Sequence, residues 1–493
     1  MATGPTGNQW RTLDKDLNRI SQVEYATNFV SRPLVGLGVS LAFIVIAALV
    51  AAVLFGQQPT SYIVIAAAAF GAYMAINIGA NDVANNMGPA VGANALSMGG
   101  AIAIAVVFES AGALLAGGDV VSTISKGIID PEAVADSGVF IWAMMAALIS
   151  SALWVNLATF VGAPVSTTHS VVGGVMGAGI AAAGFAAVNW PNMGAIAASW
   201  VISPLLGGLI AAAFLAFIKA RIIYQDDKIA AARRWVPVLI GIMAGAFSAY
   251  LAVKGLKRIV KIDIGTALLI GLAAGAFFYA VSAPFIKRQS ESLENRNRSL
   301  KILFRIPLVI SAALLSFAHG ANDVANAVGP LAAIVHAESI GEFAGKVSIP
   351  TWVMVIGAFG ISFGLLLFGP KLIRMVGSQI TKLNPMRAYC VALSAAITVI
   401  IASWLGLPVS STHIAVGGVF GVGFFREWHM ERRAKKRSKM ASKAKRIAPE
   451  ERRRRKLVRR SHFMTIIAAW VITVPAAALL SAGVFTALRA AFL

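Results

Sequence analysis

The sequence contains few charged residues and almost no cysteine. Only 13% of its 493 residues are Asp, Glu, Lys or Arg, whereas about a quarter are charged in a typical soluble domain. A single cysteine, Cys390, excludes an intrachain disulfide framework and a cysteine-cluster metal site. Residues 1–32 lack the apolar core of a cleavable signal peptide, so we interpret them as a polar N-terminal segment.

Hydrophobic residues make up 58% of the chain, and they gather in runs that are long enough to cross a bilayer as helices. Because these runs are continuous rather than alternating, they predict helices and not the strands of a barrel. We therefore expect an all-α, multi-pass protein of the inner (plasma) membrane with about 12 helical segments.

Positive charge is concentrated in one stretch. The net charge is +22, and residues 426–462 contain 17 Lys or Arg against 4 Glu. The positive-inside tendency places this stretch in the cytoplasm. It has only Trp428 as a stacking aromatic besides its His residues, which argues against binding to nucleic acid. We interpret it as a solvated loop or one attracted to anionic lipid.

One eleven-residue motif occurs twice in apolar surroundings, at 79–89 and 320–330, with nine identical positions. Each copy contains Asn-Asp and a further Asn, which are costly in hydrocarbon unless a partner or an ion satisfies them. On a helix the two Asn share a face and the Asp lies nearby, so their oxygens could bind a hard cation or a proton. The Gly-Pro that closes each copy is expected to stop the helix. The predicted cation site is Asn81, Asp82, Asn85, Asn322, Asp323 and Asn326, and the alternative is close helix packing with Asn as interhelical donors.

A second duplicated motif begins Pro-Val-Ser, and its copies at 164–177 and 408–421 agree at ten of fourteen positions. Pro favours the first turn of a helix and Ser or Thr caps it, so each copy predicts a helix start. A helix N-terminus attracts an anion, and neutral hydroxyls would bind a tetraoxyanion without holding it too tightly. The predicted anion contacts are Ser166, Thr167, Thr168, His169, Ser410, Ser411, Thr412 and His413, and the alternative is that the hydroxyls only cap a structural helix.

The two motifs recur in the same order, which indicates duplicated halves. The basic stretch corresponds to 180–197, which carries no charge, as expected if the halves have opposite orientations. We therefore predict two inverted repeats with short re-entrant hairpins. The expected parts are a polar N-terminal segment at 1–32, repeat one at 33–218, a middle linker with two apolar segments at 219–303, repeat two at 304–425, a basic cytoplasmic loop at 426–462 and a final membrane segment at 463–493.

A few further ionisable groups lie in apolar runs. His169 and His413 have no acidic or thiol ligand at metal spacing, so we interpret them as hydrogen-bonded or anion-contacting groups. His319 directly precedes the second Asn-Asp motif. Glu109 has Ile361 at the matching position of the other half. It is therefore a candidate for cation or proton coupling, with a hydrogen-bonded structural Glu as the alternative. We expect no cofactor and no metal beyond a transported cation.

The duplicated motifs resemble those of the inorganic phosphate transporter family. Gly-Ala-Asn-Asp-Val-Ala-Asn at 79–85 and 320–326 is similar to that family's signature, and Pro-x-Ser-x-Thr-His at 164–169 and 408–413 is similar to its second pattern. The resemblance implies an all-helical fold of inverted repeats, a homodimer, and symport of phosphate with Na⁺ or H⁺. Some relatives in that family carry sulfate.

We therefore predict a secondary active transporter that imports inorganic phosphate by symport with a cation, H⁺ or Na⁺. A cation beside the Asp residues would improve the anion site, and the anion would improve the cation site. A sulfate permease of the same architecture is one alternative, although a proton acceptor such as Glu109 favours phosphate. A membrane-embedded phosphoryl-transfer enzyme is the alternative from another class, but it would need a nucleophile with a positioned base or a metal centre. We therefore expect that this chain is not an enzyme.

Overall fold

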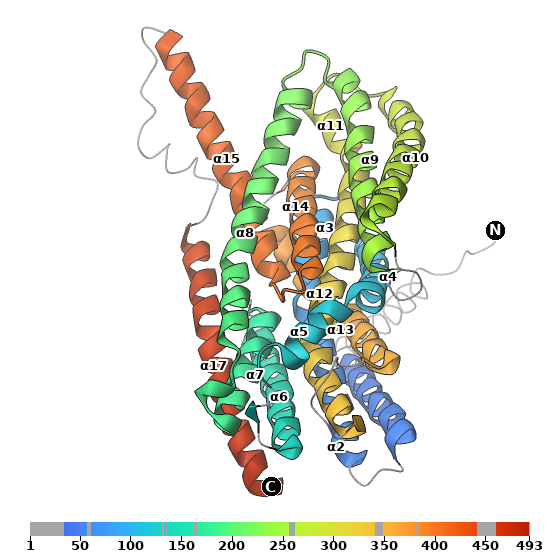
Figure 1. The fold of residues 1–493 in the computed structure, drawn as a ribbon. Coiled ribbons are helices and arrows are strands. Elements are labelled where there is room, and N and C mark those ends of the chain that lie inside the picture. The colour runs from blue at the N-terminus through green and yellow to red at the C-terminus, as the bar shows by residue number, and fades with distance from the viewer. Residues whose placement is uncertain are drawn as a thin grey trace, which may run out of the picture.

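The computed structural model describes residues 34–56, 61–130, 133–134, 136–161, 165–255, 262–340, 349–379, 383–440 and 460–492. These residues form helices and connecting turns, with one isolated β-bridge and no strand among them (Figure 1). The predicted all-α class is therefore confirmed. The N-terminal segment expected at 1–32 lies outside the described residues, as do 441–459 of the expected basic loop.

The first half begins with a helix over Leu34–Phe55. Its remaining helices are α2 (Ser61–Asn81), α3 (Val83–Gly92), α4 (Met98–Ala116), α5 (Gly118–Lys126), α6 (Ser137–Val161), α7 (Thr167–Ala183), η2 (Phe185–Ala187) and α8 (Trp190–Ile218). The middle contains the π-helical turn η3 (Lys219–Ile223), α9 (Lys228–Lys254), α10 (Ile264–Ser290) and α11 (Asn297–Leu303). The second half contains α12 (Arg305–Ile340), α13 (Thr351–Gln379), α14 (Pro385–Trp404), α15 (Ser411–Met440) and α17 (Arg460–Phe492).

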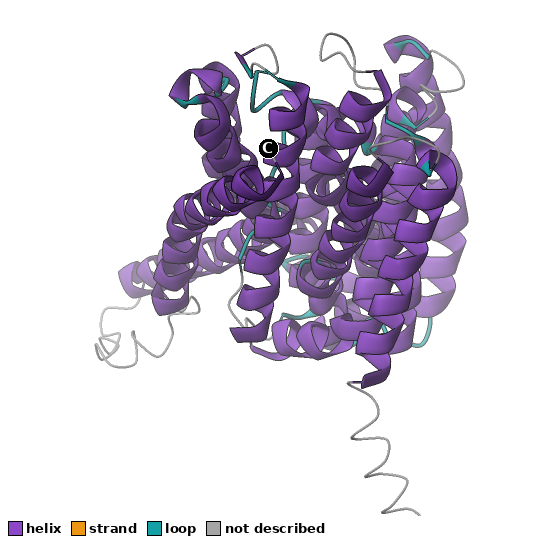
Figure 2. Cartoon of the chain, turned by 90° about the horizontal axis from the view of Figure 1, so that it is seen from below, coloured by secondary structure: helices purple, strands orange, loops and turns teal. Residues whose placement is uncertain are grey.

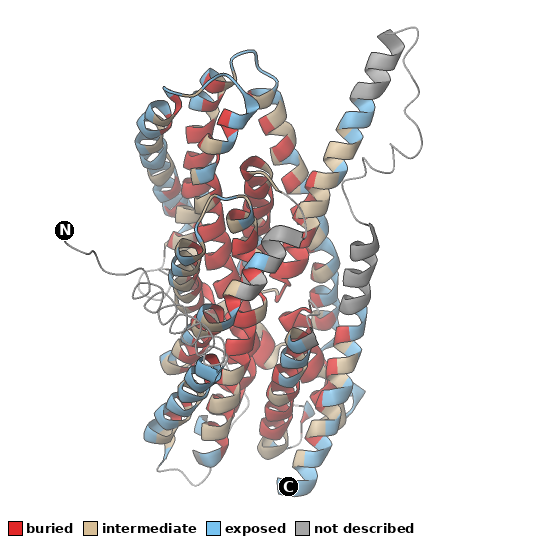
Figure 3. Cartoon of the chain, turned by 180° about the vertical axis from the view of Figure 1, so that it is seen from behind, coloured by how far each residue is buried: buried red, intermediate tan, exposed pale blue. Residues whose placement is uncertain are grey.

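Eleven helices in the described part of the chain are long and apolar enough to cross a membrane. Figure 2 gives an end view in which helices make up almost all of the drawn chain. Buried residues line the inner sides of the bundle, and exposed residues cover its outer sides (Figure 3). Large apolar side chains such as Leu272 and Phe277 of α10 are exposed, as expected of a surface that faces lipid rather than water. This arrangement agrees with the predicted multi-pass membrane protein.

The duplicated motif at 79–89 and 320–330 does not end its helix, which contradicts the prediction. Pro89 lies inside α3 and Pro330 lies inside α12. A proline removes one backbone donor, but inside a membrane bundle neighbouring groups can satisfy the freed carbonyl, so the helix continues. The first copy instead breaks earlier, at Asp82, where α2 ends and α3 begins.

The basic stretch at 426–462 is not wholly a loop. Helix α15 continues from its start at Ser411 through the apolar run and on to Met440. Its last turns leave the bundle (Figure 1). Residues such as Lys, Arg, Glu and Ala have high helix propensity, so the helix extends into the charged stretch once it has been nucleated by the packed turns before it.

The two halves contact each other in matching pairs. A Cβ atom added to Gly79 of α2 would lie 1.9 Å from the carbonyl oxygen of Ile361 on α13. A Cβ atom added to Gly320 of α12 would lie 2.1 Å from the carbonyl oxygen of Glu109 on α4. Since Gly79 matches Gly320 in the repeat and Ile361 matches Glu109, each half packs on the other through the same close approach. The opposite orientation of the halves stays a prediction.

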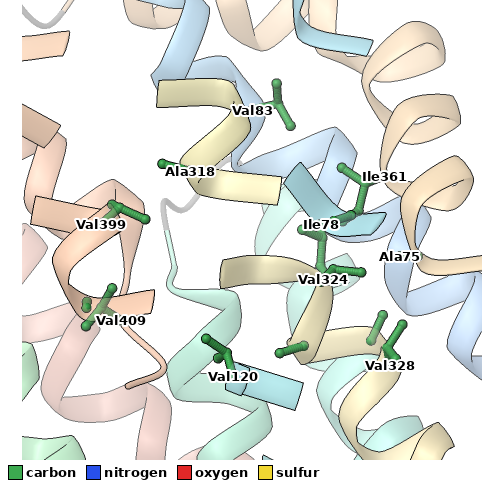
Figure 4. Packing of buried hydrophobic residues seen from close by; sticks show 14 of the residues in the cluster. Ala75, Ile78, Val83, Val120, Ala318, Val324, Val328, Ile361, Val399 and Val409 are labelled. Carbon is green, nitrogen blue, oxygen red and sulfur yellow. The ribbon is translucent and has the colours of Figure 1, made fainter. Parts of the chain in front are cut away.

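Apolar side chains fill the space between these helices. Ile78 of α2, Val324 and Val328 of α12 and Ile361 of α13 belong to one buried cluster (Figure 4). Their side chains are 0% exposed. A close-packed core of this kind holds the backbone of both Asn-Asp motifs in place, because any displacement would open voids.

Candidate functional site

The two Pro-Val-Ser motifs form helix starts, as predicted. Ser166 caps α7, and its Oγ accepts a hydrogen bond from the backbone N–H of His169 at 3.2 Å. Ser410 precedes α15, and its Oγ accepts from the backbone N–H of His413 at 3.3 Å. Both helix starts are buried, so their hydroxyls and free amide groups lie inside the protein and away from bulk water.

The two Asn-Asp motifs place one buried carboxylate beside each helix start. The carboxylates of Asp82 and Asp323 are 2% and 1% exposed. Thr167 Oγ1 donates to Asp82 Oδ2 at 2.6 Å, and Ser411 Oγ lies 3.5 Å from Asp323 Oδ2. Thr167 and Ser411 occupy matching positions in the two motifs, so each half repeats the same carboxylate–hydroxyl contact.

The second Asn of each motif contacts the opposite half. Asn85 Nδ2 donates to Thr412 Oγ1 at 2.8 Å, and Asn326 Nδ2 donates to Thr168 Oγ1 at 3.1 Å. Thr168 and Thr412 again occupy matching positions. The Thr412 hydroxyl also lies 3.5 Å from Asp82 Oδ1. Four segments that are far apart in the sequence thus meet in one polar cluster, which we call the central site: the two Asn-Asp motifs and the two helix starts.

The first Asn of each motif forms hydrogen bonds with residues outside the central site. Asn81 Nδ2 donates to Thr159 Oγ1 at 2.7 Å, and Asn322 Nδ2 donates to Ser403 Oγ at 3.0 Å. Asn322 Oδ1 also accepts from the backbone N–H of Val409, just before α15. These two Asn therefore tie the motifs to α6 and α14, beside the helix starts. Their expected role as cation ligands stays a prediction.

A chain of polar groups that the sequence did not predict extends from the central site. His319 Nδ1 lies 2.6 Å from Glu109 Oε2, and His319 Nε2 lies 2.7 Å from Asp323 Oδ2. Asn86 Nδ2 donates to the other Glu109 oxygen at 2.8 Å. The i,i+4 spacing of His319 and Asp323 was a sequence signal for their contact. The contact with Glu109 depends on packing between the two halves and had no local signal.

Three of these buried groups could hold a cation together. Asp82, His319 and Asp323 each offer one ligand atom, and these atoms all lie within 4.8 Å of one another. Carboxylate oxygens suit hard cations, and the surrounding hydroxyl and amide oxygens are further ligands of the same kind. Asp82 and Asp323 are two of the residues predicted for the cation site, whereas the participation of His319 was not predicted.

His169 and His413 lie next to each other at the boundary between the halves. Their ring centroids are 4.6 Å apart and nearly perpendicular, and the ring of His169 lies 3.9 Å from that of Trp200. The Trp200 indole N–H donates to the carbonyl oxygen of Pro408 at 3.0 Å. Both imidazoles are buried, and neither ring nitrogen of His169 has a hydrogen-bond partner among the described residues, so the hydrogen-bonded interpretation is wrong for that ring. Their expected contact with an anion stays a prediction.

Comparison with known proteins gives one consistent result. The phosphate transporter family matches residues 78–481. A Helicobacter pylori (strain J99) protein named "Putative phosphate permease" is 46% identical over 526 aligned positions, covering 96% of this chain and 98% of the relative. A Pyrococcus abyssi protein of similar name is 36% identical, covering 84% of this chain and 95% of the relative. A solved structure described as "The sodium-dependent phosphate transporter" has 34% identity and a TM-score of 0.79, covering 88% of this chain and 100% of its own.

Proposed function

Because the chain belongs to the phosphate transporter family, we propose that it imports inorganic phosphate by symport with a cation, and that the cation is Na⁺. Membership of this family makes the chain a transporter and not an enzyme, which removes the phosphoryl-transfer alternative. One observation carries the proposal: two Asn-Asp motifs and two hydroxyl-rich helix starts, one of each from either half, converge on one buried site with matching hydrogen bonds.

The helix starts supply the phosphate contacts. Each brings free backbone N–H groups and hydroxyls to the centre of the bundle, where the helix dipole favours an anion. In the structure Thr167 and Thr168 bond to polar groups of the central site, as Ser411 and Thr412 do. A phosphate that enters between them would take over these hydroxyls as donors. Neutral donors bind an oxyanion more weakly than an arginine would, so release on the other side of the membrane remains fast.

The two aspartates supply the cation contacts. Ligand oxygens of the two carboxylates lie within 4.8 Å of each other, and two unit charges of like sign at that separation repel by about 3.5 kcal/mol at an effective dielectric constant of about 20. Removal of both carboxylates from water adds a desolvation cost, which a bound cation offsets. Oxygen ligands favour Na⁺ over softer ions. The sodium dependence named for the structural relative supports the same choice.

Coupling follows from the shared site. Thr167 and Thr412 each contact Asp82 and are also expected to contact phosphate, so cation and anion act on the same groups. A cation at the carboxylates cancels negative charge that would repel the phosphate. Each ligand therefore raises the affinity of the other by the same factor. The hydrogen-bonded Glu109–His319 pair is next to this site, and proton coupling through it is the alternative.

The test is uptake of labelled phosphate into proteoliposomes under separately imposed Na⁺ and H⁺ gradients. We expect an inward Na⁺ gradient to drive uptake at constant pH, and a proton gradient without Na⁺ to drive little. Labelled sulfate is the control substrate and should not be concentrated. Uptake driven by the proton gradient alone would contradict the choice of cation, and concentration of sulfate in place of phosphate would contradict the substrate. The homodimer stays a prediction.

A further inference from the structure

The chain between α14 and α15 leads directly into the second Pro-Val-Ser helix start. Helix α14 ends at Trp404, and the chain then turns at Gly406, whose φ is +69°. Two backbone hydrogen bonds across this turn close the helix as a Schellman motif. Residues 404–410, which we call the connecting segment, end at Ser410, the residue that caps α15.

Side chains from five other helices hold the connecting segment by its carbonyl oxygens. The donors are Lys254 to Trp404, Thr123 to Gly406, Asn322 to Leu407, Trp200 to Pro408 and Thr168 to Val409, at distances of 2.7–3.1 Å. Because most of this segment lies outside a helix, its position depends on these contacts. The same contacts therefore decide where the hydroxyls of Ser411 and Thr412 lie, since these residues follow the segment directly.

Lys254 differs from the other four donors because it carries a charge and comes from the middle linker. It is the last residue of α9, and its ammonium group contacts the carboxylate of Asp119 on α5 as well as the carbonyl oxygen of Trp404. Its side chain is 12% exposed, so the carboxylate offsets much of the cost of burying the ammonium. A lysine is also favourable beside the free carbonyls at the end of a helix. One side chain thus joins α5, α9 and α14.

Helix α5 presents two polar side chains to the connecting segment. Asp119 and Thr123 are four residues apart and share one face of the helix. In the other half the matching positions are Lys371 and Met375, which offer neither a carboxylate nor a hydroxyl. The contact with Lys254 is therefore an addition to the second helix start and is not part of the duplicated site.

We propose that Lys254 is a positioning residue for phosphate transport, which holds the connecting segment against α5 and so fixes the second helix start beside the first. This role rests on the proposed function, in which Ser411 and Thr412 donate to phosphate. Hydrogen bonds weaken steeply as their distance and angle depart from the optimum, so a displaced segment would weaken these donors. Lys254 acts through the backbone of the connecting segment and not by contact with phosphate.

The test measures the phosphate affinity of the full-length purified protein by isothermal titration calorimetry at saturating Na⁺. Lys254→Met removes the ammonium group and keeps an aliphatic side chain, Lys254→Arg keeps the charge, and Asp119→Asn removes the charge of the partner. The matched control is Lys287→Met, which removes an exposed lysine from the last turn of α10. Thermal unfolding checks that each variant is folded.

We expect Lys254→Met to weaken phosphate binding about tenfold, Lys254→Arg to weaken it less, and Lys287→Met to leave it unchanged. Asp119→Asn should also weaken binding, because the lysine loses its charged partner. Where Lys254→Met does not fold, Asp119→Asn takes its place in the comparison below.

Double-mutant cycles separate positioning from a general loss of stability. Misplacement of the second helix start costs less once its hydroxyl has been removed, so Lys254→Met should be coupled more strongly to Ser411→Ala than to Thr167→Val of the first start. Equal coupling to both helix starts, or wild-type affinity in Lys254→Met, would overturn this role alone. If the wild-type protein binds no phosphate, the proposed function and this role fail together.

Discussion

The convergence of the two halves on one phosphate can be tested with Thr168 and Thr412, which occupy matching positions. Each is buried, and each accepts a hydrogen bond from an Asn of the opposite half, at 3.1 and 2.8 Å. Thr→Val keeps the shape of the side chain and removes the hydroxyl. A hydrogen bond to a charged group contributes about 1.5–3 kcal/mol, so each single change should weaken phosphate binding about 10- to 150-fold.

The double variant decides whether the two hydroxyls contact the same ligand. Residues that act on one ligand are usually coupled by about 0.5–3 kcal/mol, so the two losses should not add. The assay is phosphate affinity by isothermal titration calorimetry at saturating Na⁺, with thermal unfolding as a check on folding. Thr486→Val is the matched control, because its hydroxyl donates to a helix carbonyl on the exposed side of α17. Strict additivity, or a loss in only one of the two single variants, would refute the shared site.

Three further results are expected. Gly320→Ala should destabilise the protein by about 1–3 kcal/mol in thermal unfolding, because its Cβ would meet the Glu109 carbonyl, whereas Gly483→Ala, with nothing within 4 Å, should not. Glu109→Gln should raise the Na⁺ concentration for half-maximal uptake about tenfold, because His319 would be held less firmly beside Asp323. An unchanged Na⁺ concentration would leave Glu109 with a purely structural role. Cysteine at Ser438 should react with an impermeant maleimide only from the cytoplasmic side, and labelling of intact cells from outside would reverse the topology.

Much of the central site could be predicted from sequence because it is built from short local signals. The Ser caps at 166 and 410 follow from helix-start chemistry, and the buried aspartates follow from polar residues in apolar runs. Duplication also predicted that Glu109 and Ile361 occupy matching positions. The structure agrees, because Gly320 packs against the Glu109 backbone as Gly79 packs against that of Ile361.

The parts that failed depend on long-range packing. The Gly-Pro pairs end a helix in isolation, but in the bundle α12 continues through Pro330. The contact of His319 with Glu109 joins residues 210 positions apart, and nothing local in the sequence indicates it. The prediction for the basic stretch depended on its charge alone. Charge indicates the side of the membrane but not whether the residues form a helix, so the extension of α15 to Met440 was not predicted.

Cation and phosphate are proposed to stabilise each other in one site. The most direct measurement is phosphate affinity at increasing Na⁺, together with Na⁺ affinity at increasing phosphate, for the wild-type protein and for Asp82→Asn and Asp323→Asn. We expect each ligand to raise the affinity of the other by the same factor, and both variants to reduce this factor strongly. Phosphate affinity that does not change with Na⁺, or that keeps its full Na⁺ dependence in both variants, would contradict this proposal.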